Sequence, residues 1–388
     1  MSSIFAQGPL FLLTMIFLLG VVVVVHELGH YLAARAFGGA AESFSVGFGR
    51  PLFEVTDQRN TRWRINWIPF GGFVKFVGEP QTADDVGKIE TGPVGKHFME
   101  MTVLQRSIIA AAGPIANFVL ASFLFALIAW NHDTPVHRVV IADVMAGGPA
   151  QEAGLVAGDA LIEVDGTPVQ QSGTLIQKIM LSSGTPLTLL VERDGVTRDV
   201  SVIPTRQDRD NGLGQIHKVG TINVSLSVEQ IDVIDHGPIS AIGVGVRKTG
   251  ETLGTTVHML GRLVTGREPI DQLSGPIGIG DISRRAVSAT MEVENVSLGR
   301  RLAAVGWLMI NICAFVSVGI GLFNLLPLPV LDGGHLVFNA YEAITGQLMP
   351  QKVQEVSLRF GMILLLGIAA IVTWGDIVET GIFQTFAG

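Results

Sequence analysis

Five consecutive residues carry the groups that metal-assisted hydrolysis needs: His26, Glu27, Leu28, Gly29 and His30. In an α-helix, residues four apart share a face, so the two histidines can offer imidazole nitrogens to one zinc ion. The glutamate beside them is a candidate general base, because it can take a proton from an attacking water. The sequence therefore predicts zinc-dependent hydrolytic chemistry at this point of the chain.

The motif follows residues 1–25, which contain no charged side chain, so it stands at the end of a predicted membrane helix. Ionisable groups at membrane depth cost roughly 2.5–3.5 kcal/mol each, and three of them within five residues indicate function. The alternative is a pair of packed core histidines with a glutamate that extends to the membrane surface. That alternative gives no compensating function for the free-energy cost of placing three ionisable groups at membrane depth.

A second polar group follows the third apolar segment. Residues 302–331 carry no charge, and Asp332 is the first charged residue after them. Pro327 and Pro329 interrupt the helix just before it, and irregular backbone at membrane depth is tolerated only where protein or a water-filled cavity surrounds it. A catalytic zinc site needs three protein ligands, so we expect Asp332 to be the third and the two prolines to border the substrate. The alternative is a helix end capped by aspartate and glycine.

Composition indicates a membrane protein. Hydrophobic residues make up 48% of the 388 residues and charged residues 15%, whereas ordinary soluble proteins have about 25% charged residues. The mean hydropathy is +0.46. The net charge of −8 argues against nucleic acid as a partner, and the lipid bilayer is the expected surrounding. Cys313 is the single cysteine, which excludes a disulfide within the chain and a thiolate-rich zinc site, and it is expected to fill space in a helix.

Four apolar segments are long enough, or nearly so, to cross a bilayer as helices. We predict a polytopic α-helical membrane protein of about four transmembrane helices, with an inserted extracytoplasmic β-rich domain and a membrane-associated β-hairpin. The predicted parts are a first transmembrane helix with the zinc motif (1–37), a cytoplasmic loop with the hairpin (38–106), a second transmembrane helix (107–131), the β-rich domain (136–226), a linker whose helical patches suit either the membrane surface or solvent (227–301), a third transmembrane helix with the third ligand (302–335) and a fourth (356–376).

The distribution of basic residues predicts orientation. Lysine and arginine crowd the connection between the first two spans, whereas the segments before the first span and after the fourth carry none. Positive charge favours the cytoplasmic side, so this connection should be cytoplasmic. The basic residues are Arg35, Arg50, Arg59, Arg62, Arg64, Lys75, Lys88, Lys96 and Arg106. Both termini and the β-rich domain should then be extracytoplasmic, with the zinc motif near the cytoplasmic end of its helix.

The β-rich domain resembles a PDZ domain of the circularly permuted bacterial kind. Two Asp-Gly pairs, at 165–166 and 194–195, predict tight hairpins because both positions tolerate positive φ. The resemblance is carried by residues 147–155, then Gly158-Asp159, then residues 164–166. PDZ domains bind extended peptide tails at a sheet edge, and the matching loop would lie near 219–222. That loop matches imperfectly, so a PDZ fold with weak or absent peptide binding stays open, and 206–214 is expected to be a surface loop.

The cytoplasmic connection contains two strand-like runs around Pro69 to Gly72, within residues 62–77. We predict a hairpin that dips toward the active site and contacts substrate through Gly71, Gly72 and Phe73. A membrane helix must unwind before it can be hydrolysed, and an edge strand near the metal could hold the unwound segment. The alternative is a hairpin anchored at the membrane surface by its tryptophans.

The chain resembles the site-2 protease family of intramembrane zinc metalloproteases over almost its full length, in particular the bacterial regulator-of-sigma-E protease branch. Six ordered motifs carry the resemblance: residues 26–30, 44–49, 68–75, 113–118, 274–277 and 324–335. It implies zinc bound by His26, His30 and Asp332, with Glu27 as catalytic base and acid. It also implies that Asn324 holds or orients substrate and that the hairpin is a membrane-reentrant β-loop. The best-known members of that branch carry two PDZ domains, whereas this chain has room for one.

The resemblance implies an enzyme of the bacterial inner membrane that cuts peptide bonds within single-pass transmembrane substrates. Regulated proteolysis of an anti-sigma factor after a first cut, in a stress response, and clearance of remnant signal peptides are both open. The alternative function is a catalytically inactive membrane adaptor that collects extracytoplasmic tails through its PDZ domain. An adaptor has no need of a glutamate between ligands or of a buried aspartate, so bound zinc separates the two hypotheses.

Overall fold

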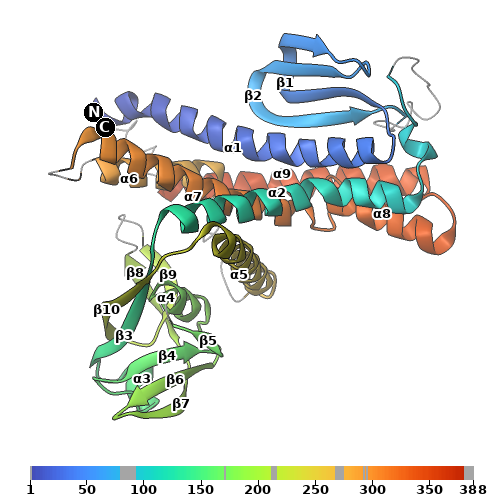
Figure 1. Cartoon of the computed structure of the whole chain (residues 1–388). Helices are drawn as coiled ribbons and strands as arrows, with labels where there is room; N and C mark the ends of the chain where they lie inside the picture. The colour runs from blue at the N-terminus through green and yellow to red at the C-terminus, as the bar shows by residue number, and fades with distance from the viewer. Residues whose placement is uncertain are drawn as a thin grey trace. The chain divides into compact units, whose positions relative to one another are not determined.

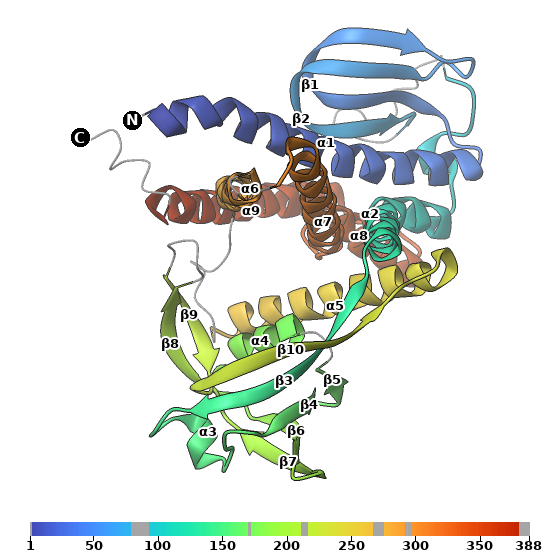
Figure 2. The same cartoon turned by 60° about the vertical axis from the view of Figure 1, so that its left-hand side comes forward.

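The structure is a computed structural model that describes residues 2–78, 93–169, 172–210, 216–266, 275–291, 293 and 296–379. The chain forms two compact units, Met1–Ile128 with Ile242–Gly388, and Ala129–Ala241 (Figures 1 and 2). Lys88 of the basic connection, Ser274 of the fifth motif and residues 211–214 of the expected loop lie outside the described residues.

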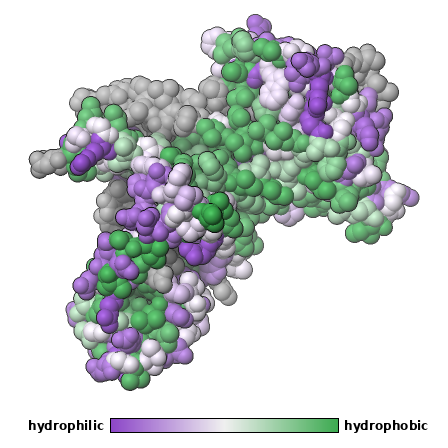
Figure 3. All heavy atoms as spheres, viewed as in Figure 1, coloured by the Kyte–Doolittle hydropathy of each residue, from purple (hydrophilic) through white to green (hydrophobic). Residues whose placement is uncertain are grey.

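Within the described residues, four helices are long and apolar enough to cross a membrane, as expected. The helices wholly in the first unit are α1 (Ser2–Ala36), the short helix η2 (Phe98–Glu100), α6 (Pro276–Met291), α7 (Leu298–Asn324), α8 (Asp332–Thr345) and α9 (Gln351–Glu379). Most of α2 (Val103–Asn131) and most of α5 (Pro238–Val264) also belong to it. The four candidate spans are α2, α7, residues 18–36 of α1 and residues 351–377 of α9. Hydrophobic side chains cover much of the visible face of this helical unit (Figure 3).

The third span ends earlier than the expected boundary at residue 335. Helix α7 stops at Asn324, and α8 begins at Asp332 as a separate helix. Pro327 and Pro329 lie in the turn between them, and neither has an N–H to continue a helical ladder. The third ligand candidate therefore opens a helix of its own.

The predicted hairpin exists, but its turn was placed wrongly. Strand β1 (Ala41–Thr56) pairs antiparallel with β2 (Arg62–Phe76), and residues 57–61 join them. Residues 69–72, expected to be the turn, form a bend inside β2, where Gly71 has a φ of +73°. Each strand is bent, so residues 43–46 of β1 pair with residues 62–65 on one side and with residues 72–75 on the other. Residues 72–75 therefore form an outer edge of this small sheet.

The sheet packs on the C-terminal part of α1, which carries His26 and His30, through aromatic side chains. The ring of Tyr31 meets that of Trp63 at 5.1 Å between centroids, and Trp63 stacks on Phe44 at 4.6 Å. Farther along α1, Leu18 and Val22 pack with Cys313 of α7 in a second apolar cluster. Cys313 is thus a buried space-filling residue, as the sequence predicts.

The fifth resemblance motif marks the start of α6. The backbone N–H groups of Gly275 and Gly278 donate to the carboxylate of Asp376 on α9, at 3.0 and 2.9 Å. These groups belong to the first turn of a helix, where N–H groups have no partner within the helix. An aspartate from a distant part of the chain therefore caps α6.

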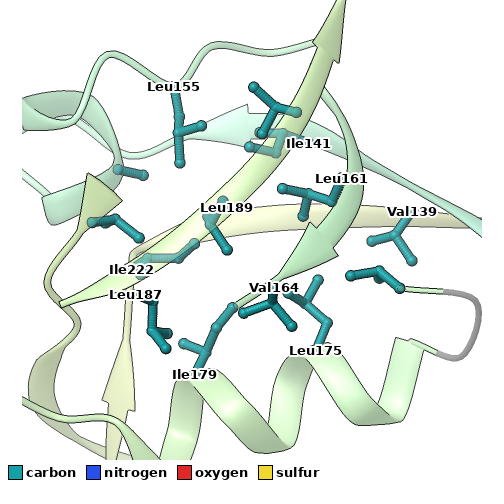
Figure 4. Packing of buried hydrophobic residues seen from close by; sticks show 14 residues of the cluster. Val139, Ile141, Leu155, Leu161, Val164, Leu175, Ile179, Leu187, Leu189 and Ile222 are labelled. Carbon is teal, nitrogen blue, oxygen red and sulfur yellow. The ribbon is translucent and has the colours of Figure 1, made fainter. Parts of the chain in front are cut away.

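The second unit is a twisted sheet with the strand order β10-β3-β4-β6-β7, with β5 paired to β4. Its elements are β3 (Thr134–Val144), α3 (Pro149–Glu152), β4 (Ala160–Val164), β5 (Thr167–Pro168), α4 (Ser172–Leu181), β6 (Leu187–Arg193), β7 (Val196–Val202), β8 (Thr205–Asp210), β9 (Ile216–Thr221) and β10 (Val224–Ile234). Figure 4 shows its core, in which Leu175 and Ile179 of α4 face the sheet residues Val164 and Leu189. This is the predicted PDZ-like domain, somewhat longer than 136–226.

Both predicted Asp-Gly turns are confirmed, since Asp165, Gly166, Asp194 and Gly195 all have positive φ. The expected surface loop at 206–214 is wrong in its first half. Residues 205–210 form β8, which pairs with β9. Strand β8 is polar throughout, so alternation of apolar residues could not reveal it, and backbone pairing with β9 decides its structure.

A buried ion pair fastens the second unit. Asp159 is fully buried, and Arg193 donates to its two oxygens at 2.5 and 2.7 Å. Arg193 also donates to the carbonyl oxygen of Gly154 at 2.9 Å. These hydrogen bonds from Arg193 hold the pKa of Asp159 below its usual range. The stabilisation is therefore present at neutral pH and is lost as the pH falls through that lowered pKa.

We expect Asp159→Asn to speed amide hydrogen exchange in β4 and β6, because Arg193 then faces a neutral partner that can no longer accept two charge-assisted hydrogen bonds. Mass spectrometry on the full-length protein at neutral pH would measure the exchange. Asp199→Asn, at an exposed position of β7, is the matched control and should leave exchange unchanged. Equal exchange in both variants would contradict this role of the ion pair.

Candidate active site

Three side chains from two helices converge on one point. The Nε2 atoms of His26 and His30 lie 3.2 Å apart on α1. The Oδ2 atom of Asp332, at the start of α8, lies 3.1 Å from the first and 3.3 Å from the second. The two histidines are buried, with 6% and 8% of their surface exposed. The two histidines share one face of α1, and Asp332 lies beside them, as the sequence predicts.

The triangle has the dimensions of one face of a zinc tetrahedron. With zinc–ligand bonds of about 2.0–2.1 Å, neighbouring ligand atoms of a tetrahedral site lie about 3.3 Å apart. The Oδ2 atom of Asp332 is buried and has no hydrogen-bond partner among the described residues, although two imidazole nitrogens lie close to it. The spacing of the three atoms therefore fits a single zinc ion bound by all of them.

The main chain of α2 orients one of the two imidazoles. His30 Nδ1 lies 2.8 Å from the carbonyl oxygen of Ile109, which can only accept a hydrogen bond. His30 therefore carries its hydrogen on Nδ1 and keeps the lone pair of Nε2 free. Helices α1 and α2 approach closely because Gly29 and Gly113 lack side chains: a methyl group would meet the carbonyl oxygen of Ala112 at the first and the imidazole of His30 at the second.

The start of α8 is held by close packing and by an ion pair. A side chain at Gly333 would overlap the carbonyl oxygens of Leu325 and Leu326, so this glycine lets the turn after α7 fold against α8. Ten residues along α8 from Asp332, Glu342 accepts a hydrogen bond of 2.6 Å from Arg106 of α2. Arg106 is buried, with 6% of its surface exposed. The pair ties α8 to the helix that also orients His30.

Glu27 lies between the histidines and the edge strand of the small sheet. The backbone N–H of Val74 in β2 donates to its Oε2 atom at 3.0 Å. Gly72 packs against Glu27 and Val23, and a Cβ there would lie 3.4 Å from Cγ of Glu27. The strand thus fixes the carboxylate beside the three converging atoms, where it can accept a proton from water.

The residues predicted to bind substrate make contacts within the protein, and these contacts do not reveal a binding role. Asn324 ends α7, and its amide donates to the carbonyl oxygen of Ile320 at 3.0 Å. Phe73 stacks on Phe48 at 6.1 Å between ring centroids, and Pro329 packs against the position of Gly361 on α9. Pro327 is exposed in the turn between α7 and α8. Their predicted contact with substrate stays a prediction.

Asn117, for which the sequence predicts no role, lies in α2 with none of its surface exposed. Its Nδ2 atom lies 3.2 Å from Nδ1 of His26. A signal was available, because a polar side chain within an apolar membrane span is costly and therefore informative. The helix pairing that brings it to His26 was not available from the sequence.

Comparison with known proteins supports the same chemistry. The family described as peptidase family M50 matches residues 14–368. A relative from Agrobacterium fabrum, named as a candidate zinc metalloprotease, is 36% identical over 374 residues and covers 95% of both chains. Metalloprotease MmpA of Caulobacter vibrioides is 35% identical over 396 residues, covering 97% of this chain and 98% of the relative.

Among solved structures, the PDZ domain of an SdrC-like protein from Listeria monocytogenes is 21% identical, covers 23% of this chain and 85% of its own, and gives a TM-score of 0.19. The class of protein follows from the membrane-type helices, the His-His-Asp group and the long sequence matches: the chain is a membrane zinc metalloprotease. It belongs to peptidase family M50, the site-2 protease family.

The close approach of Gly113 to His30 leads to a prediction. Gly113→Ala should weaken zinc binding by roughly 10-fold or more, because the added methyl displaces the imidazole or separates the helices. Zinc affinity of the purified protein, measured by competition with a chelator, tests this. Gly20→Ala is the control, since a Cβ at Gly20 of α1 meets nothing within 4 Å. Unchanged zinc affinity in Gly113→Ala would show that the helices do not hold His30 in this way.

Proposed function

We propose that the protein is an intramembrane protease that hydrolyses peptide bonds within transmembrane segments of other membrane proteins. His26, His30 and Asp332 would hold the zinc ion, and Glu27 would be the catalytic base. The observation that supports this most strongly is the triangle of ligand atoms at 3.1–3.3 Å. Two of these atoms belong to α1, which is apolar enough to span a membrane, and the third belongs to the start of α8.

A bound zinc ion supplies Lewis acidity, which polarises a peptide carbonyl and makes water easier to deprotonate. Glu27 then accepts the proton of the attacking water and returns it to the leaving amine. The hydrogen bond from Val74 keeps one carboxylate oxygen in place while the other remains available. The reaction consumes one water and separates one peptide bond into a carboxyl group and an amino group.

Substrate would lie along the edge strand of β2. A helical segment has its backbone hydrogen bonds closed internally, so it must unwind before its carbonyl can be attacked. Among the described residues, 72–75 pair with β1 along one side, and the N–H of Val74 donates to Glu27. An unwound segment paired beside Gly71, Gly72 and Phe73 would thus pass next to the catalytic carboxylate. Asn324, Pro327 and Pro329 are proposed to border it from the turn between α7 and α8.

The proposed substrates are single-pass membrane proteins, and the PDZ-like domain would receive their extracytoplasmic tails or those of another protein. Strand β10 is an edge strand of that domain, which supports peptide addition. An anti-sigma factor already cut outside the membrane and a remnant signal peptide are both suitable substrates. Membrane peptides that accumulate in cells carrying Glu27→Gln would identify them. The adaptor function is disfavoured because it leaves the converging ligand atoms without a role.

The first catalytic prediction separates base from ligand. Glu27→Gln should keep zinc and lose about 10²- to 10⁴-fold or more of its peptide hydrolysis, because the amide cannot accept the proton of water. His30→Ala and Asp332→Ala should lose both zinc and activity. Metal content and cleavage of a model transmembrane peptide in detergent are the two readouts. Glu152→Gln, an exposed position of α3, is the control. Activity of Glu27→Gln within about tenfold of wild type would remove Glu27 from the mechanism.

The second prediction concerns topology in the inner membrane of a bacterium. Because basic residues crowd 38–106, that connection is proposed to face the cytoplasm, with both termini and the PDZ-like domain outside. A reporter active only outside the cytoplasm should be silent when fused after residue 90 and active when fused after residue 200. The reverse pattern would overturn the orientation.

A further inference from the structure

The two histidines of the proposed zinc site differ in what contacts their second ring nitrogen. His30 Nδ1 lies 2.8 Å from the backbone carbonyl of Ile109, an acceptor that cannot change its role. His26 Nδ1 lies 3.2 Å from the side-chain amide of Asn117, a group that carries both donors and an acceptor. The tautomer of His30 is therefore fixed by the main chain, whereas that of His26 depends on one side chain.

Asn117 is itself held firmly in place. Its backbone carbonyl accepts a hydrogen bond of 2.8 Å from Ser317 of α7, in addition to its position in the α2 helix. Gly321, one turn farther along α7, packs against Cβ of Asn117. The residue is fully buried between α1, α2 and α7. A side chain fixed at its base can present either end of its amide to His26 only by rotating about the Cβ–Cγ bond.

The orientation of that amide matters for metal binding. A zinc ion at the centre of the ligand triangle takes the lone pair of His26 Nε2, so Nδ1 must carry the hydrogen and its partner must accept it. Of the two ends of the Asn117 amide, only the oxygen can accept a hydrogen bond from Nδ1. In the present arrangement the amide nitrogen faces Nδ1, and Oδ1 is buried with no hydrogen-bond partner among the described residues. A half-turn of the amide brings this unpartnered oxygen to His26.

We propose that Asn117 is a positioning residue that selects the zinc-binding tautomer of His26 and holds its ring, by turning its amide oxygen toward Nδ1. The inference rests on the proposed zinc site. It also accounts for a fully buried amide in a membrane helix, where polar side chains are costly. A leucine at this position would fill a similar volume but would leave Nδ1 of His26 without an acceptor.

The test compares zinc affinities of purified full-length protein in detergent, measured by competition with a chelator. Asn117→Leu should weaken zinc binding by roughly 10- to 100-fold, the usual effect of losing a partner of a ligating histidine. Asn117→Asp keeps an acceptor in the same place and should bind zinc at least tenfold more tightly than Asn117→Leu. Should Asn117→Leu not fold, Asn117→Ala removes the amide without added bulk and should show the same loss.

One further variant and one further measurement make the outcome specific. Ser317→Ala removes the hydrogen bond to the backbone of Asn117 but leaves the amide, so its zinc affinity should stay within about threefold of wild type. Substitution of Co²⁺ for zinc gives a visible spectrum that reports ligand geometry, and this spectrum should change in Asn117→Leu but not in Ser317→Ala. If both variants lost zinc affinity equally, the loss would come from altered helix packing and not from the amide of Asn117, and the proposal would be overturned.

Failure of this inference is distinguishable from failure of the zinc site itself. If His26→Ala binds zinc as tightly as wild type, His26 is not a ligand and both proposals fall. If His26→Ala loses zinc while Asn117→Leu and Asn117→Ala keep it within about threefold, the zinc site stands and the positioning role of Asn117 is wrong.

Discussion

The structure depends on bringing three electron-pair donors within little more than 3 Å of one another inside a group of apolar helices. Two of them, on His26 and His30, come from one face of α1, and the third comes from Asp332 at the beginning of α8. Each donor is costly to bury away from water, and without a cation their mutual approach brings lone pairs together. A zinc ion bound by all three would resolve this conflict, and the packing of α1, α2 and α8 holds the donors in place.

Small residues and broken helices make that approach possible. Gly29 and Gly113 let α1 and α2 come close enough for the carbonyl of Ile109 to reach His30. The turn between α7 and α8 interrupts the helical backbone at the point where Asp332 begins its helix. The ion pair of Arg106 with Glu342 then links α8 to α2. Glycines and helix breaks would destabilise a single membrane helix, but here they allow the donor side chains to come together.

Much of this could be predicted from the sequence, because the signals are local. The spacing of His26 and His30 fixes a shared helix face, and the Asp-Gly pairs of the PDZ-like domain fix its tight turns. Asp332 was recognisable as a charge after a long uncharged run. Predictions failed where pairing between distant segments decides the structure: the bend at 69–72 in β2 looked like a turn, and the polar strand β8 looked like a loop.

Asn117 shows the limit most clearly. Its identity as a polar residue in an apolar span was visible, but its partner, His26, lies 91 positions away and is brought to it only by the crossing of α1 and α2. The same applies to Ile109, whose contribution is a backbone carbonyl and so leaves no trace in residue type. Local patterns identify the residues that do chemistry, whereas tertiary packing identifies those that orient them.

X-ray absorption at the zinc edge of the purified protein reports the atoms bound to the metal, and so tests whether His26, His30 and Asp332 hold it. A site built from these residues should show nitrogen and oxygen ligands at about 2.0–2.1 Å, with the outer-shell scattering of two imidazoles. A sulfur ligand at about 2.3 Å, or the signature of one imidazole or of three, would contradict a site built from His26, His30 and Asp332.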